Sequence, residues 1–114
     1  MVSNKIYSFL GLAMKAGALV SGEDACERAI KSEKALLVIV ACDASKNTIK
    51  KFSDICTYRS VQIRYFGNKD LIGRYIGKGS RSVVAVTVSG FAAKLVEMID
   101  MDNKESGGGL IGKS

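Results

Sequence analysis

Two short segments of this sequence carry the side chains best suited to binding chemistry. The first spans residues 20–24 (Val-Ser-Gly-Glu-Asp) and is followed by Arg28 and Lys31, and the second spans residues 77–83 and contains two basic side chains. The first segment is typical of a helix start, where free backbone N–H groups and the positive end of the helix dipole favour phosphate. This pattern favours an anionic ligand.

Each polar side chain of the first segment has its own chemistry. Gly22 lets a nucleic-acid backbone or base approach closely. The carboxylates of Glu23 and Asp24 suit phosphate poorly, but a carboxylate accepts hydrogen bonds from the amino groups of guanine or cytosine. Arg28 and Lys31 could neutralise phosphates. The same spacing is also compatible with ordinary first-turn helix acids and a solvated Lys31, so the residues alone leave both interpretations open.

Composition favours a binding protein over an enzyme. The chain has 17 Lys and Arg against 11 Asp and Glu, a formal net charge of +6 and a pI near 9.3, which favour a polyanionic partner. It has no histidine, which is the commonest general base and the commonest metal ligand. Cys26, Cys42 and Cys56 are too few and too scattered for a disulfide framework or a zinc site, so we interpret them as small buried hydrophobes. We therefore expect no catalysis, no metal and no cofactor.

The elements that must position these segments alternate between helices and strands. Such alternation predicts an α/β fold, a three-layer α/β/α sandwich with a four-stranded mixed, largely parallel sheet. In chain order, we expect a helix capped by Ser3-Asn4 and ended by Gly17, a short strand at 19–20, a helix beginning at 21–24, a strand at 35–41, a helix after Ser45 with an apolar stripe over 49–56, a strand at 61–66, a helix at 69–76, a loop at 77–82, a strand at 83–88 and a helix from Ser89.

The composition changes near residue 100. We expect one domain over residues 1–100 and a flexible Gly-rich tail over 101–114, because the tail has few side chains to bury. Residues 107–114 match the phosphate-loop pattern G-x-x-x-x-G-K-S letter for letter. A phosphate loop needs a strand before it and a helix after it. Residues 102–106 are no buried strand and nothing follows Ser114, so we predict no nucleotide site there.

No feature of the sequence predicts a membrane or secreted location. No apolar run reaches the roughly 18 residues of a membrane span. Residues 1–5 lack the basic start and long apolar stretch of a secretory signal. We therefore expect a cytoplasmic protein without a membrane partner.

Several stretches, taken in this order and spacing, resemble one protein family. The chain is similar to the kink-turn-binding family of large-subunit ribosomal proteins, of the seven-Ae and thirty-e type, and within it to a small bacterial YlxQ-like branch. The resemblance covers roughly residues 5 to 99. The stretches that carry it are residues 6–17, 20–24, 28–32, 36–48, 68–77 and 81–86.

This resemblance implies an RNA-binding site. In the family, residues at the start of the second helix face the tandem sheared G·A pairs of a kink-turn, which is a sharply bent RNA. A second group surrounds a flipped-out nucleotide, and a later loop lies against the kinked backbone. The residues at the matching positions are Gly22, Glu23, Asp24 and Arg28 for the first group, Ile49, Lys69 and Arg81 for the second, and Lys78, Ser82 and Val83 for the loop; with Ser21 and Lys31 they form the predicted RNA-binding site.

The sequence departs from the family's pattern at three places. Asp24-Ala25 stands where the best-studied members have Asn-Glu, so the guanine-reading carboxylate is displaced or is supplied by Glu23 or Asp24. Ser45 stands where a Glu is frequent, and residues 77–80 hold one extra residue. These differences leave the RNA preference open.

The sequence thus predicts a non-catalytic RNA-binding protein for a kink-turn or similar bent RNA. We expect a monomer that is ribosome-associated or accessory. The alternative is a protein-interaction module of the same fold, which would use an exposed apolar loop around Ile76 and Val83. An enzyme subdomain is disfavoured because the chain is short, and a phosphate receiver at Asp43 is disfavoured because no acidic pair accompanies it.

Overall fold

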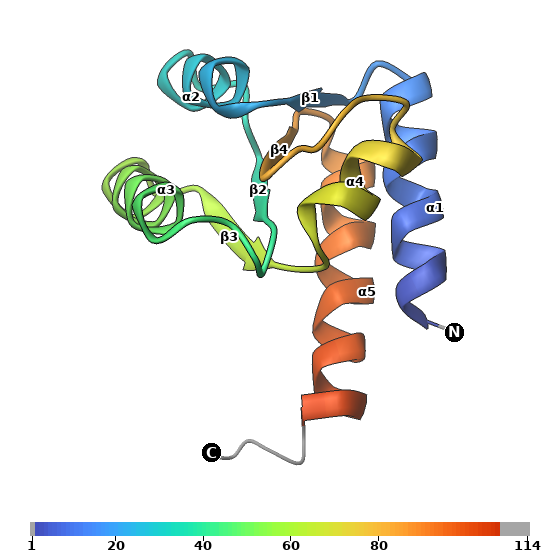
Figure 1. Cartoon of the computed structure of the whole chain (residues 1–114). Coiled ribbons are helices and arrows are strands. Elements are labelled where there is room, and N and C mark those ends of the chain that lie inside the picture. The colour runs from blue at the N-terminus through green and yellow to red at the C-terminus, as the bar shows by residue number, and fades with distance from the viewer. Residues whose placement is uncertain (1, 108–114) are drawn as a thin grey trace.

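Helices and strands alternate along the chain in the predicted order (Figure 1). The computed structural model describes residues 2–107 of the chain, and the side chains of residues 3–104. The elements are α1 (Val2–Lys15), β1 (Leu19–Ser21), α2 (Glu23–Lys31), β2 (Leu37–Val40), α3 (Lys46–Arg59), β3 (Gln62–Tyr65), α4 (Lys69–Tyr75), β4 (Val83–Val86) and α5 (Ser89–Gly107).

The four strands form one mixed sheet in the order β1-β4-β2-β3. The predicted α/β class and the four-stranded mixed sheet are confirmed. The expectation that neighbouring strands pair mostly in parallel is wrong. Only β2 and β3 pair in parallel, whereas β4 lies antiparallel between β1 and β2. The loop after α4 returns the chain to the edge where β3 ends, since the N–H of Arg81 donates to the C=O of Lys69 (3.0 Å). Strand β4 therefore starts at that edge and runs opposite to β3.

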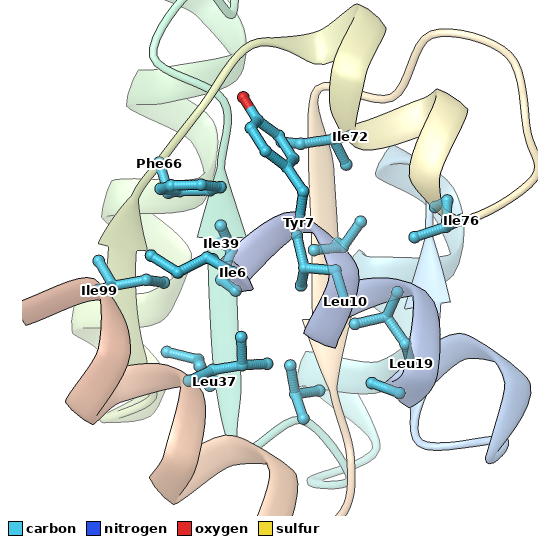
Figure 2. Close-up of a cluster of buried hydrophobic side chains, with 14 of the residues drawn as sticks. Ile6, Tyr7, Leu10, Leu19, Leu37, Ile39, Phe66, Ile72, Ile76 and Ile99 are labelled. Atoms are coloured by element: carbon cyan, nitrogen blue, oxygen red, sulfur yellow. The ribbon is translucent and has the colours of Figure 1, made fainter. Parts of the chain in front are cut away.

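Helices cover both faces of the sheet, as the three-layer prediction requires. Helices α1, α4 and α5 lie on one face, and α2 and α3 lie on the other (Figure 1). Successive side chains of a strand point to opposite faces, so Leu37 and Ile39 of β2 enter the first core, while Val38 and Val40 enter the second. Figure 2 shows the first core packed between α1, α5 and the sheet. Strands β2 and β4 are fully buried, as their continuous apolar runs predict.

Tyr7 of α1 ties this core to the turn between β3 and α4. Its ring stacks on Tyr75 with centroids 5.2 Å apart and lies 4.8 Å from the ring of Phe66. Its hydroxyl oxygen accepts a hydrogen bond from the N–H of Asn68 (3.1 Å). The aromatic body is thus buried while its polar end is satisfied, and the turn that leads to Lys69 is held in place.

Both terminal helices extend further than the sequence patterns indicate. Helix α1 begins at Val2, so Ser3 and Asn4 lie in its first turn and do not cap it. Helix α5 continues to Gly107, so the domain boundary predicted after Asp100 falls inside a helix. The segment directly after Asp100 contains no proline and no glycine before Gly107, so nothing in it interrupts the helix. The phosphate-loop match continues into residues 108–114, which lie outside the described residues.

The three cysteines do not share one environment. Cys26 and Cys56 are buried in the second core, as predicted, but Cys42 is exposed. It follows β2 in the turn toward α3, so the apolar run that precedes it does not bury it. Over residues 2–107, none of the helices combines the length and the apolar character that crossing a membrane requires.

Candidate nucleic-acid interface

The predicted site residues gather mainly at one edge of the sheet. At this edge β1, β2 and β3 end and β4 begins, because β4 runs antiparallel to its neighbours. The loops that meet there are called the loop edge below. It consists of residues 21–24, 42–45, 67–69 and 77–83.

Backbone hydrogen bonds join these loops into one continuous rim. Each loop donates to, or accepts from, a neighbouring loop, so their relative positions are set by main-chain atoms. The bonds run from the N–H of Gly22 to the C=O of Val83 (3.0 Å), from Ala41 to Ser82 (2.8 Å), from Cys42 to Gly67 (2.8 Å) and from Arg81 to Lys69 (3.0 Å).

Arg81 contacts Ser21, the residue before Gly22, across this rim. The guanidinium Nε of Arg81 donates to the hydroxyl oxygen of Ser21 (3.2 Å), and its Nη1 donates to the C=O of Ser80 (3.0 Å). A Cβ built on Gly22 would lie 4.0 Å from the same Nε. A guanidinium has five N–H donors, so donors of Arg81 remain for a ligand. The two segments that the sequence singles out are therefore one surface.

Gly22 holds a backbone conformation that other residues rarely adopt. It caps α2 with φ 94° and ψ 155°, a region that is essentially restricted to glycine. The turn from β1 into α2 therefore requires glycine for its backbone.

Gly22→Ala is expected to lower the free energy of unfolding by about 1–3 kcal/mol, because alanine is strained at this φ and ψ. The measurement is urea unfolding followed by circular dichroism. Gly90→Ala is the matched control, since a Cβ on Gly90 meets nothing within 4 Å and its φ is not positive. Equal stability of the two variants would contradict this account of Gly22.

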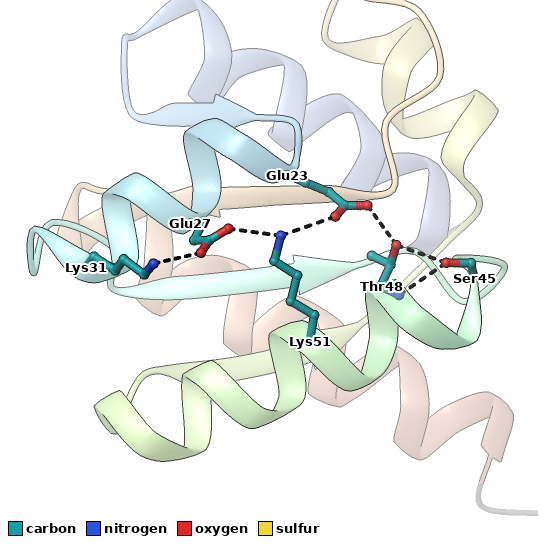
Figure 3. A network of polar contacts seen from close by, with 6 residues as sticks. All are labelled: Glu23, Glu27, Lys31, Ser45, Thr48 and Lys51. Atoms are coloured by element: carbon teal, nitrogen blue, oxygen red, sulfur yellow. Dashed lines mark hydrogen bonds and ion pairs between the residues drawn. The ribbon is translucent and has the colours of Figure 1, made fainter.

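The two carboxylates at the start of α2 have different surroundings. Glu23 Oε2 accepts a hydrogen bond from the Thr48 hydroxyl (2.7 Å), and Glu23 Oε1 lies 3.7 Å from Lys51 Nζ (Figure 3). Asp24 is exposed and, among the described side chains, has no hydrogen bond or ion pair. Asp24 is therefore the carboxylate that is available to a ligand.

The C-terminal half of α2 is less closely connected to the rim. Glu27 pairs with Lys31 (2.8 Å) and with Lys51 (2.9 Å), and hydrogen bonds from these two ammonium groups lower the pKa of Glu27 from 4.5 to about 2. Lys31 is the last residue of α2, so the structure does not bring it to the loop edge. Arg28 lies between the two ends of the helix and is exposed.

Lys69 and Lys78 lie on exposed positions of the rim. Helix α4 starts at Lys69 after Asn68, whose side-chain oxygen accepts from the N–H of Leu71 (2.8 Å). Asp43 Oδ1 accepts from the N–H of Lys69 (2.9 Å). Asp43, disfavoured by the sequence as a phosphate receiver, thus joins the turn after β2 to the start of α4. Among the described side chains, Lys69, Lys78 and Arg81 form no ion pair within 4.0 Å.

The apolar members of the predicted site contribute differently. Ile49 is half-buried against the second core, so part of its side chain faces outward. Val83 is fully buried, and only its backbone takes part in the rim; Ser82 is half-buried beside it. Ile76 is also buried, so the exposed apolar loop that the interaction-module alternative needs is not present around Ile76 and Val83.

Sequence reasoning missed Thr48, which is buried and hydrogen-bonded between α2 and α3. Its hydroxyl also accepts from Ser45 Oγ (3.0 Å), and its N–H donates to that same Ser45 oxygen (3.1 Å). The spacing of Ser45 and Thr48 indicates a helix cap, but no local pattern shows that Thr48 reaches Glu23.

The family model that matches this chain is the ribosomal protein L7Ae/L30e/S12e/Gadd45 family, over residues 4–96. A relative from Bacillus subtilis (strain 168), named RNA-binding protein YlxQ, is 45% identical over 94 residues, which are 82% of this chain and 94% of the relative. A protein of the same name from Enterococcus faecium is 41% identical over 96 residues, or 84% of this chain and 92% of the relative.

Solved structures show the same fold. A protein of unknown function from Bacillus halodurans C superposes with a TM-score of 0.81 at 38% identity, covering 84% of this chain and 97% of that one. The Giardia lamblia 15.5kD RNA binding protein superposes with a TM-score of 0.74, covering 88% of each chain. Its identity is 19%, so this second likeness bears on the fold alone.

Proposed function

Because the chain belongs to the ribosomal protein L7Ae/L30e/S12e/Gadd45 family, we propose that it is a non-catalytic RNA-binding protein whose loop edge binds a kink-turn or a similarly bent RNA. The relatives at 41% and 45% identity are named RNA-binding proteins. The observation that carries the proposal is the hydrogen bond from Arg81 to Ser21, which places the guanidinium beside Gly22 at the start of α2. It combines a helix N-terminus, a close-approach glycine and a guanidinium without a carboxylate partner.

The rim offers the two kinds of contact that a bent RNA needs. Lys69, Lys78 and Arg81 supply positive charge for phosphates at a place where the RNA backbone turns sharply. Proteins recognise RNA chiefly through bulges and splayed bases, because the deep groove of A-form RNA excludes side chains. The half-buried Ile49 offers an apolar surface to a base turned out of the stack. Binding of this kind stabilises the bent conformer by preferring it to the straight one.

Asp24 is the carboxylate that we assign to base recognition. An ionised carboxylate only accepts hydrogen bonds, and the amino groups of guanine and cytosine are suitable donors. Glu23 already accepts from Thr48 and lies beside Lys51, whereas Asp24 is exposed. Arg28 extends the positive surface along α2, and Lys31, paired with Glu27, contributes least.

We further propose that the protein acts as a monomer in the cytoplasm, as a ribosome component or an accessory factor. Three cysteines remain as free thiols, which suits a reducing compartment. The net charge of +6 favours association with RNA over most protein surfaces.

The test of this function is a gel shift with a kink-turn RNA and with a duplex of the same length that lacks the bulge. We expect the kink-turn to bind at least about tenfold more tightly, because the straight duplex cannot place phosphates and a free base on the rim together. Affinity should fall as salt rises, since phosphate contacts release counterions. Equal binding of both RNAs would leave only general attraction to polyanions. No salt-sensitive binding to either RNA would favour the interaction module.

A further inference from the structure

Glu23 stands in the first turn of α2 at the loop edge, but its carboxylate faces the neighbouring helix α3. One oxygen accepts from Thr48 (2.7 Å), and the other lies 3.7 Å from Lys51 Nζ. Figure 3 shows these groups between the two helices, with Lys51 between Glu23 and Glu27. The three residues Glu23, Thr48 and Lys51 are called the α2–α3 bridge below.

Thr48 is the one polar residue in the buried core of the described chain, with 7% of its surface exposed. Its hydroxyl is fully used, because it donates to Glu23 and accepts from Ser45 Oγ (3.0 Å). Ser45 in turn caps α3 by accepting from the N–H of Thr48 (3.1 Å). The buried Thr48 hydroxyl therefore favours the arrangement in which Glu23 of α2 and Ser45 at the start of α3 both stay within hydrogen-bond reach, although the side chains of Glu23 and Lys51 are partly exposed.

The α2–α3 bridge joins the starts of two helices that both open onto the loop edge. Helix α2 begins directly after Gly22, and helix α3 begins directly after Ser45. Apolar packing between the helices involves residues further along each of them, such as Cys26 and Phe52. In the described chain, the polar contacts that link α2 with α3 all end on Glu23 or Glu27, and of these two only Glu23 belongs to the loop edge.

Lys51 also compensates the negative charge of two acidic side chains that would repel an anionic ligand. Its ammonium lies 2.9 Å from Glu27 and 3.7 Å from Glu23. Hydrogen bonding to Glu27 raises the pKa of Lys51, so it stays charged. The carboxylates of Glu23 at the loop edge and of Glu27 one turn further along α2 would otherwise repel phosphate, since like charges in proximity are unfavourable.

We infer that Glu23, Thr48 and Lys51 are positioning residues for RNA binding, which hold the starts of α2 and α3 at the spacing a bent RNA requires without touching the RNA. This inference rests on the function proposed above. It reassigns Glu23 from the predicted contact residues to the support behind them. Two loops that are already ordered in the free protein bind more tightly, because less conformational entropy is lost when the complex forms.

Thr48→Val tests the bridge, because valine keeps the shape of threonine and removes the hydroxyl. We expect affinity for a kink-turn RNA to fall by about three- to tenfold, with the slope of log affinity against log salt unchanged, since no phosphate contact is lost. Thr48→Ser keeps the hydroxyl and should retain wild-type affinity. Thr57→Val is the matched control, because Thr57 is exposed near the far end of the same helix.

Lys51→Met gives a second measurement, with Lys50→Met as its control. Both variants lose one positive charge on α3, but among the side chains that the structure describes Lys50 pairs only with the exposed Asp54 (3.0 Å) on its own helix. We expect Lys51→Met to weaken RNA binding more than Lys50→Met by about threefold or more. Equal effects of the two variants would mean that Lys51 acts through charge alone, which overturns its place in the bridge.

Hydrogen exchange in the free protein separates the bridge from the proposed function. The first-turn bonds to follow are Cys26 N–H to Gly22 C=O (3.0 Å) and Ile49 N–H to Ser45 C=O (3.0 Å). Both amides should exchange about tenfold faster in Thr48→Val. Unchanged exchange, unchanged RNA affinity or a flatter salt slope in Thr48→Val overturns the bridge. If the wild-type protein does not bind kink-turn RNA, the proposed function is overturned instead.

Discussion

Arg81→Ala is expected to weaken binding of a kink-turn RNA by about 1–3 kcal/mol, which is a fall of about 5- to 150-fold in affinity. Arg81 donates a hydrogen bond to Ser21 beside Gly22 and forms no ion pair with any described carboxylate. Its free N–H donors can bind a phosphate or a base edge through paired hydrogen bonds. The measurement is a titration of labelled RNA at several salt concentrations.

The salt dependence also identifies what Arg81 contacts. Loss of one phosphate contact lowers the slope of log affinity against log salt by about one, whereas loss of a base contact leaves it unchanged. Arg81→Lys should restore little, because an ammonium cannot reproduce the planar fork of a guanidinium. Arg59→Ala is the control, because it removes the same positive charge from a residue that ends α3, at the opposite edge of the sheet from the loop edge. Comparable losses in Arg81→Ala and Arg59→Ala would remove Arg81 from the site.

Gly73→Ala is expected to lower both the stability of the fold and the affinity for RNA, although Gly73 is not one of the predicted RNA-binding residues. Gly73 is buried in α4, and a Cβ there would collide with the backbone of Gly79 in the loop that carries Lys78 and Arg81. The loop is also bonded to α4 at this point, by the N–H of Lys78 and the C=O of Gly73 (2.8 Å). Inserting a methyl group into such a contact costs about 1–3 kcal/mol or more, and it must displace the loop.

Thermal unfolding and RNA titration below the unfolding range together test Gly73→Ala. We expect lower stability, and also an affinity at least about tenfold below wild type in the fraction that remains folded. Gly90→Ala has no atom near its added methyl group and should behave as wild type. A folded Gly73→Ala protein with normal affinity would show that the position of the 77–83 loop does not matter for RNA.

Local patterns in the sequence are sufficient to place the helices and strands. The spacing of Ile6, Leu10 and Ala13 predicts one buried helix face, and all three side chains are buried. The apolar run within residues 83–88 predicts a buried strand, and the structure has one that is buried throughout over Val83–Val86. These features follow from periodicity within one element, so no long-range contact is needed to infer them.

Features that depend on contacts between elements could not be inferred in this way. The antiparallel placement of β4 follows from the return of the chain at Arg81 and Lys69, and the α–β alternation of the sequence does not encode that return. The exposure of Cys42 depends on where β2 stops. Similarly, Glu23 has the pattern of a first-turn acid, and only the packing of α2 against α3 reveals its bond to Thr48.

The candidate site was predictable in part for the same reason. The family resemblance and the helix-start pattern together select Gly22 and Arg81, and in the structure Arg81 donates a hydrogen bond to Ser21, the residue before Gly22. The same reasoning includes Lys31, which lies at the other end of α2, and Val83, whose side chain is buried. Distance along a helix and burial within a strand are properties of the assembled fold, so a pattern of residue types does not report them.

The position of β4 in the sheet has a consequence for how the protein is made. Leu19 pairs with Val86 across the antiparallel β1–β4 ladder, and Val40 pairs with Val83 on the other side. Strand β4, one of the two internal strands, is thus the last strand to be synthesised, and pairings between residues so distant in sequence form late and slowly. While the chain is still emerging during translation, β1 and β2 have no strand between them, and Arg81 has not reached Ser21. The nascent polypeptide therefore assembles the loop edge, the surface proposed to bind RNA, only after β4 has left the exit tunnel.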